Sequence, residues 1–250
     1  RSTLFPYTTL FRSGSCAGAD KSIPALHLPA EANPALGQRG IRLSLARPAL
    51  LKIQLRAILR AGSAGSVGIL LPFVVSGEEI AAVKKILAEV KEELAASHIP
   101  CAGHAPLGLT VETPAAAIMA DQLAKEVDFF SIGTNDLAQY TVAADRTNPV
   151  ADALGGYFHP AVLRLIAQTA KAGEAAGIPV TVCGEMAADP TALPLLLGMG
   201  IKILSMDAAS LLWIRAAVHR LLKKTARRLW EDVQGMGNYQ IGRASCRERV

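Results

Sequence analysis

Short apolar runs alternate along this chain with longer stretches in which apolar residues recur at helical spacing. The runs predict five strands, at residues 67–72, 107–112, 127–132, 178–183 and 201–206. The run at 127–132, with Val127, Phe129, Phe130 and Ile132, is typical of a parallel strand that helices bury on both faces. The pattern therefore favours an α/β fold built around a parallel sheet.

The segments between these runs carry helix signals. Pro48 and Gly62 bracket a helical pattern at residues 48–61, and Ser76 with Glu79 forms a capping box for a helix that runs to about residue 96. Further helices are predicted from residue 114 and at 160–176, 192–197 and 208–222, with weak helical character from 223 to 240. Strands alternating with helices imply parallel βα units. Five units are visible, or six if the segment around Arg39 carries a strand, so the sheet is either open or an incomplete barrel.

Polar side chains follow three of the predicted strands at the point where each strand ends. Glu112 ends one strand, Asn135 and Asp136 follow the next after Gly133, and Cys183 ends a third. In a parallel barrel these strand ends share one face, where active sites lie. Asp136 is open to a second interpretation, as the cap of a helix that begins after the strand.

Two carboxylates at neighbouring strand ends, Glu112 and Asp136, suit a hard divalent ion such as Mg²⁺, because Zn²⁺ would prefer nitrogen and sulfur ligands. Arg39 and Arg146 would add bidentate donors for a phosphate. For Arg39 a solvated surface position or a carboxylate partner is also open. Together these residues favour a phosphorylated anion bound through Mg²⁺.

The two ends of the chain are expected to be foreign to the fold. Residues 3–13 match one reading frame of a common DNA sequencing adapter, and residues 241–250 match a frame of its reverse complement. We therefore expect residues 1–13 and 241–250 to be adapter-derived, the alternative being a genuine N-terminal strand and a basic tail. These ends hold five arginines and one glutamate, and so account for four of the five net positive charges. The remainder is nearly neutral, which argues against nucleic acid as a partner.

Composition narrows the class of protein further. Hydrophobic residues make up 51% of the chain, enough for one large core, but no apolar stretch reaches the length of a membrane helix. Cys16, Cys101 and Cys183 are widely spaced and odd in number once Cys246 is set aside. We expect reduced thiols and a cytoplasmic protein rather than a disulfide framework or a zinc site.

Six motifs stand in order along the chain. They are Asn-Pro-Ala-Leu-Gly-Gln-Arg-Gly-Ile-Arg at 33–42, Val-Glu-Thr-Pro-Ala at 111–115, Asp-Phe-Phe-Ser-Ile-Gly-Thr-Asn-Asp at 128–136, Asp-Arg at 145–146, Cys-Gly-Glu at 183–185 and Leu-Leu-Gly-Met-Gly at 196–200. Together these motifs resemble the phosphoenolpyruvate (PEP) binding barrel of the phosphoenolpyruvate-protein phosphotransferases, Enzyme I of the sugar phosphotransferase system. The resemblance covers residues 14 to about 220, and residues 159–166 are similar to the form fused into fructose-type multiphosphoryl transfer proteins.

This resemblance implies a role for each polar residue at the strand ends. Glu112 and Asp136 match the family's Mg²⁺ ligands, and Arg39 and Arg146 match its phosphate-contacting arginines. Asn135 and the neighbouring amides match a contact to the anionic end of the substrate. Cys183 matches the proton donor that converts enolpyruvate to pyruvate after the phosphoryl group has moved to a protein histidine.

Departures from the family pattern imply a fragment. The histidine domain that accepts the phosphoryl group, the first barrel strand and one of its arginines are missing, and Gly68 stands where relatives often have arginine. The fold expected is an incomplete TIM (β/α)8 barrel of the PEP/pyruvate type at 14–225, with a tail at 226–240.

The partners that the resemblance implies are PEP and pyruvate, a histidine-containing phosphocarrier protein reached through the missing domain, and a second copy in the intact parent. A nucleotide-using relative, pyruvate phosphate dikinase or phosphoenolpyruvate synthase, and a non-catalytic dimerisation scaffold are the alternatives.

Overall fold

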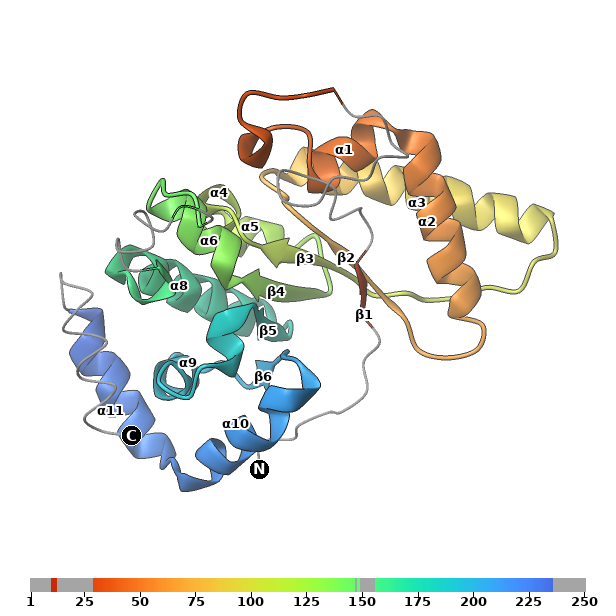
Figure 1. Cartoon of the computed structure of the whole chain (residues 1–250). Coiled ribbons are helices and arrows are strands. Elements are labelled where there is room, and N and C mark those ends of the chain that lie inside the picture. Colours follow the sequence, from red (N-terminus) through yellow and green to blue (C-terminus); the bar gives the residue numbers. More distant parts are fainter. Residues whose placement is uncertain (1–9, 13–28, 147, 149–155, 236–250) are drawn as a thin grey trace. The chain divides into compact units, whose positions relative to one another are not determined.

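Figure 1 shows the chain as a computed structural model, which describes residues 10–12, 29–146, 148 and 156–235. The predicted ends 241–250, most of 1–13 and residues 236–240 of the tail lie outside these ranges. The chain forms two compact units. We call residues 5–110 with 126–128 the N-terminal unit, and residues 111–125 with 129 onward the C-terminal unit, and describe each by itself.

The N-terminal unit is built on short parallel strands and two long helices. Its elements, in order, are β1 (Leu10–Arg12), η2 (Pro34–Leu36), α1 (Gly40–Ala46), α2 (Pro48–Ala61), β2 (Gly68–Leu71), α3 (Gly77–Ala96) and β3 (Leu107–Val111), whose last residue belongs to the other unit. β2 pairs in parallel with β1 and with β3. Apolar side chains of α2 such as Leu55 and Leu59 are fully buried.

The C-terminal unit carries three more parallel strands. Its elements are α4 (Pro114–Ile118), α5 (Ala120–Leu123), β4 (Phe129–Gly133), α6 (Thr134–Thr141), η3 (Gly156–Phe158), α8 (Pro160–Ala176), β5 (Val180–Cys183), η4 (Glu185–Ala188), α9 (Leu193–Gly198), β6 (Ile203–Leu204), α10 (Ala208–Arg220) and α11 (Lys223–Gln234). β5 pairs in parallel with β4 and with β6. The α/β class with parallel strands is thus confirmed, and the described strands are fewer than the eight of a closed barrel.

Most predicted elements form where the sequence places them. α2 and α8 span the predicted residues, and α3 begins with the predicted capping box, in which Ser76 and Glu79 satisfy each other's backbone amides. All five predicted strands are present, although the last is only two residues long. These elements could be predicted because their signals are local.

Two segments differ from the sequence predictions. The stretch after Arg39, considered as a sixth strand, is the helix α1, which begins at Gly40 in the left-handed conformation (φ 54°). After β4 the sequence left a helix open only as an alternative, and α6 begins there. In both places polar or glycine residues at the helix start hide the apolar period on which the prediction depends.

Two elements, β1 and α11, overlap the predicted domain boundaries. β1 falls within residues 1–13, and its three residues pair with Gly68, Ile69 and Leu70 of β2. At the other end, the predicted boundary between residues 225 and 226 lies inside α11, which packs on α9 and buries Ala226, Leu229 and Val233. The adapter origin of residues 1–13 and 241–250 stays a prediction.

α10 exposes large apolar side chains to solvent. Leu212 is 73% exposed and Trp213 77%, whereas Ile214 is buried. β6, the strand before this helix, pairs with β5 along one edge. Such an edge is what a barrel-like sheet that has not closed would present. No helix in the described part of the chain has both the length and the apolar character needed to cross a membrane.

Candidate functional site

The ends of β4 and β5 bring three of the predicted site residues into one region of the C-terminal unit. Gly133, the last residue of β4, is the register partner of Cys183, the last residue of β5. α6 begins immediately at Thr134 with Gly133 as its N-cap, so Asn135 and Asp136 lie in its first turn. Asp136 is therefore not the helix cap that the sequence left open, although a carboxylate in a first turn is stabilised by the helix dipole.

Gly184 allows the end of β5 to approach the first turn of α6. Its φ is 92°, a conformation that only glycine adopts readily. A Cβ at this position would lie 2.7 Å from Thr134 Oγ1 and 3.0 Å from Asn135 Oδ1. The hydroxyl of Thr134 uses this approach to donate to the Cys183 carbonyl at 3.1 Å. A glycine is thus required on both conformational and steric grounds.

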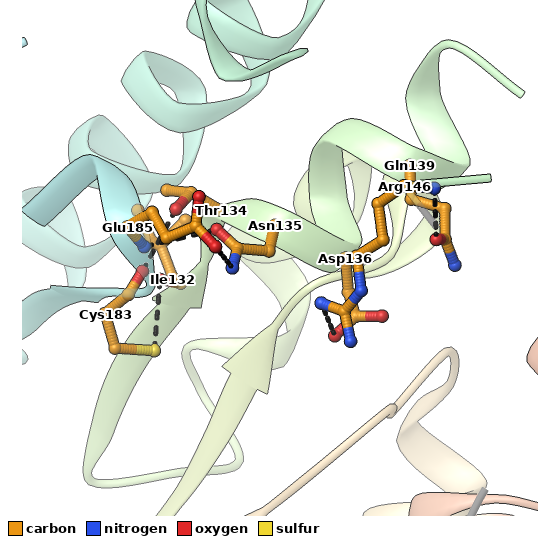
Figure 2. A network of polar contacts seen from close by, with 8 residues as sticks. All are labelled: Ile132, Thr134, Asn135, Asp136, Gln139, Arg146, Cys183 and Glu185. Carbon is orange, nitrogen blue, oxygen red and sulfur yellow. Dashed lines mark hydrogen bonds and ion pairs between the residues drawn. The ribbon is translucent and has the colours of Figure 1, made fainter. Parts of the chain in front are cut away.

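Asn135 is held by Glu185 through two hydrogen bonds (Figure 2). Its side-chain Nδ2 donates to Glu185 Oε1 at 3.3 Å, and its Oδ1 accepts from the Glu185 backbone N–H at 3.2 Å. This double contact fixes the orientation of the amide at the strand ends. The sequence had grouped Glu185 with the polar strand ends but had given it no role.

Cys183 is a buried free thiol, 6% exposed. Its sulfur accepts a hydrogen bond from the Ser131 hydroxyl at 3.3 Å and donates one to the Ile132 carbonyl at 3.3 Å. Both partners belong to β4, the neighbouring strand. Cys101, in the N-terminal unit, is the other free cysteine among the described residues.

Asp136 and Arg146 lie next to each other. Arg146 Nη1 is 3.6 Å from Asp136 Oδ2, and the Asp136 side chain is only 13% exposed. The backbone N–H of Arg146 donates to Gln139 Oε1 at 3.1 Å, which ties the turn after α6 to the helix (Figure 2). A carboxylate and a guanidinium predicted to serve the same ligand are thus neighbours.

Glu112 follows β3 and is buried, with 8% of its surface exposed. The next residue, Thr113, caps α4 by accepting a hydrogen bond from the Ala116 backbone N–H. Within the described ranges no group of three or more His, Cys, Asp or Glu side chains gathers as a protein-only metal site would require. Mg²⁺ usually keeps several waters and takes only one or two protein carboxylates, so this result does not test the assignment of Glu112 and Asp136 as its ligands, which stays a prediction.

Arg39 lies in the N-terminal unit, where it precedes α1. Its guanidinium carbon is 4.8 Å from the centroid of the Phe73 ring, and that of Arg42 is at the same distance from the same ring. Arg42 also donates to the Leu36 carbonyl at 2.8 Å. Cation–π contact holds Arg39 against a ring that is itself buried. The convergence of Arg39 with the residues of the C-terminal unit stays a prediction.

A pocket of about 180 Å³ opens beside α6 in the C-terminal unit. Asn135, Gln139, Arg146, Tyr157 and Glu185 are among its lining residues, whereas Asp136 and Cys183 are not. Two of the predicted substrate-binding residues therefore face one hollow that is suited in size to a small anion. Tyr157 is anchored there by its hydroxyl, which donates to Asp189 at 2.9 Å.

The sequence of this chain matches a known protein family. The sequence profile described as "PEP-utilising enzyme, PEP-binding domain" matches residues 10–223. The chain belongs to this family. The PEP-binding domain match begins within the segment predicted to be adapter-derived and ends at the start of α11.

Several curated relatives of this PEP-binding domain share one name. Proteins named phosphoenolpyruvate-protein phosphotransferase are similar to it at 48% identity in Geobacillus stearothermophilus, over 88% of this chain, and at 49% in Lactococcus lactis, over 83%. A Bacillus subtilis protein of the same name is 45% identical over 88% of the chain. The chain spans 38%, 36% and 38% of the length of these relatives respectively.

Among solved structures, a citrate lyase of Burkholderia xenovorans LB400 has a similar fold. It superposes with a TM-score of 0.50 at 20% sequence identity, covering 80% of this chain and 68% of that one. At this identity the likeness concerns the fold alone. It supports the barrel-like arrangement of parallel strands expected for the PEP-binding domain.

Proposed function

We propose that this chain is the substrate-binding part of a phosphotransferase that moves the phosphoryl group of PEP to a protein histidine and releases pyruvate. The observation that carries the proposal is that Asn135, Asp136 and Cys183 lie at or directly after the ends of β4 and β5, with Arg146 beside Asp136. The amide and the guanidinium could bind the anionic groups of a phosphorylated three-carbon acid. The carboxylate could bind its metal ion, and the thiol could supply a proton. The shared name of these relatives favours this function over that of a nucleotide-using enzyme.

Glu112 and Asp136 would hold the Mg²⁺ ion of this proposed site. When bound, the ion would neutralise negative charge on the phosphate and carboxylate of PEP. Arg146 would offer paired N–H donors to phosphate oxygens from its place beside Asp136. Asn135, held rigidly by Glu185, would contact the anionic end of the substrate. Arg39, if brought to the same face, would supply the second guanidinium.

Cys183 would give its thiol proton to the methylene carbon of enolpyruvate. The S–H bond breaks with its electron pair left on sulfur, and a C–H bond forms from the π electrons of the enolate that remains once the phosphoryl group has left, which yields pyruvate. A thiol is suited to this step because its pKa lies close enough to neutrality for it to alternate between protonated and thiolate forms. The proton is replaced from water.

Further features of the intact parent belong to the same proposal. The acceptor histidine and the phosphocarrier protein would act through a domain outside this chain, and the parent would work in sugar transport in the cytoplasm. A homodimer is proposed for the parent, for which the exposed side chains of Leu212 and Trp213 on α10 offer one available surface.

Replacing Arg146 by alanine is expected to weaken PEP binding about 10- to 100-fold, because a charge-assisted hydrogen bond contributes about 1.5–3 kcal/mol. Isothermal titration of PEP in the presence of Mg²⁺ measures the change. Arg164→Ala is the matched control, since Arg164 lies on α8 in the same unit and its Nη2 donates to the Gln234 carbonyl. Equal affinities for wild type and Arg146→Ala would remove Arg146 from the site.

A further inference from the structure

The hydroxyl of Ser131 lies against the sulfur of the predicted proton donor. Ser131 is 2% exposed, and its Oγ donates to Cys183 Sγ at 3.3 Å, while the thiol donates to the Ile132 carbonyl. Figure 2 shows the thiol and its contact with Ile132 at the end of β5. The buried sulfur therefore accepts one hydrogen bond and donates one.

Strand register creates this contact. Gly133 pairs with Cys183 and Ser131 pairs with Thr181 in the parallel ladder between β4 and β5. Side chains two residues apart on a strand point to the same face, so Ser131 and Cys183 face the same side of the sheet. The contact is fixed by the backbone and needs no long flexible side chain.

The two hydrogen bonds respond differently when the thiol loses its proton. The S–H to Ile132 carbonyl bond disappears, because a thiolate has no proton to donate and a carbonyl oxygen repels its charge. The Ser131 O–H to sulfur bond remains and becomes stronger, since its acceptor is now ionised. The hydroxyl therefore favours the thiolate over the thiol, which lowers the energy of the state left after proton transfer.

We propose that Ser131 is a positioning residue that holds the Cys183 sulfur in place and stabilises its thiolate. The catalytic consequence of this inference rests on the proposed function, whereas the effect of Ser131 on the thiol does not. The competing explanation is that Ser131 only satisfies its own buried hydroxyl. In that case its loss would change stability without changing the ionisation of Cys183.

The charged residues predicted to lie near Cys183 are the same in every variant at residue 131 that tests the proposed role of Ser131. Glu185 follows Cys183 by two residues and belongs to η4, Asp136 and Arg146 come from α6 and the turn after it, and Glu112 follows β3. None of them is altered by a substitution at residue 131. A change in the ionisation of Cys183 between variants at residue 131 therefore measures the effect of the Ser131 hydroxyl.

The test is the pKa of Cys183, measured from thiolate ultraviolet absorbance against pH. Each spectrum is taken as the difference between a protein and its Cys183→Ser partner, which removes the signals of tyrosines and other cysteines and does not require reagents to reach a buried sulfur. Ser131→Ala is expected to raise the pKa by about one unit, because a hydrogen bond to a charged group is lost.

Two controls separate the hydroxyl from a packing effect. Ser131→Thr keeps the hydroxyl and is expected to retain the wild-type pKa. Thr181→Val removes a different buried hydroxyl, on β5, which donates to the Phe130 carbonyl at 3.2 Å. This substitution is expected to leave the pKa of Cys183 unchanged. Identical pKa values for wild type and Ser131→Ala, or an equal rise in Ser131→Thr, would overturn the proposal. If the conversion of enolpyruvate to pyruvate did not depend on Cys183, the proposed function would be overturned. The measured effect of Ser131 on the pKa of Cys183 would still hold.

Discussion

Replacing Cys183 by serine is expected to slow the Mg²⁺-dependent exchange of pyruvate methyl hydrogens with solvent by ~10²- to 10⁴-fold, the usual contribution of a positioned acid or base. In this exchange the thiolate takes a proton from the methyl group to form the enolate, and the thiol then returns a solvent deuteron to the same carbon. Serine keeps the shape of the side chain, but its hydroxyl is a far weaker acid than a thiol. The reaction requires no phosphoryl acceptor, so it can be measured on this chain.

The loss of the methyl proton resonance of pyruvate in deuterated water gives the rate. Cys101→Ser is the matched control, because Cys101 is a free cysteine of the N-terminal unit and has no predicted role. Exchange by the Cys183→Ser variant at the wild-type rate, or an equal loss in Cys101→Ser, would show that Cys183 is not the proton donor.

Phe130→Ala is expected to lower the free energy of unfolding by about 3–5 kcal/mol, the usual cost of removing a buried phenylalanine. Among the described residues Phe130 is the largest fully buried side chain, and it is the second residue of β4, the strand that ends in the candidate site. Alanine would remove its contacts and leave a cavity that the paired strands cannot readily close.

Urea unfolding followed by circular dichroism measures this difference. Leu212→Ala is the control, since Leu212 is 73% exposed on α10 in the same unit and its loss should change stability by less than about 0.5 kcal/mol. If the two variants unfolded at the same urea concentration, Phe130 would not be the core residue that its burial indicates.

The parts of the fold that could be predicted from the sequence are those whose signals are local. α8 has a proline at its first position, a left-handed Gly177 at its end and apolar residues at helical spacing, and its predicted bounds are confirmed. α6 was predicted only as an alternative, and with the wrong cap, because it is short and opens with Thr134, Asn135 and Asp136, which are typical of turns. The shortening of the last strand depends on pairing at the sheet edge, which no local pattern records.

For the candidate site, residue identities could be predicted but their partners could not. Carboxylates and a thiol at strand ends stand out in the sequence, and parallel topology predicts that they share a face. The pairing of Asn135 with Glu185 joins residues 50 positions apart and depends on the register of β4 and β5. The stacking of Arg39 on Phe73 likewise depends on how a loop folds over a strand end.

The most direct test of the proposed site is PEP binding to this chain with and without Mg²⁺, measured by titration calorimetry for the wild type and for Asp136→Ala. The control Asp121→Ala removes a carboxylate of α5 that lies on the surface of the same unit. We expect wild type and Asp121→Ala to bind PEP more tightly when Mg²⁺ is added, and Asp136→Ala to lose that dependence. Equal binding by all three proteins, unchanged by Mg²⁺, would contradict the account.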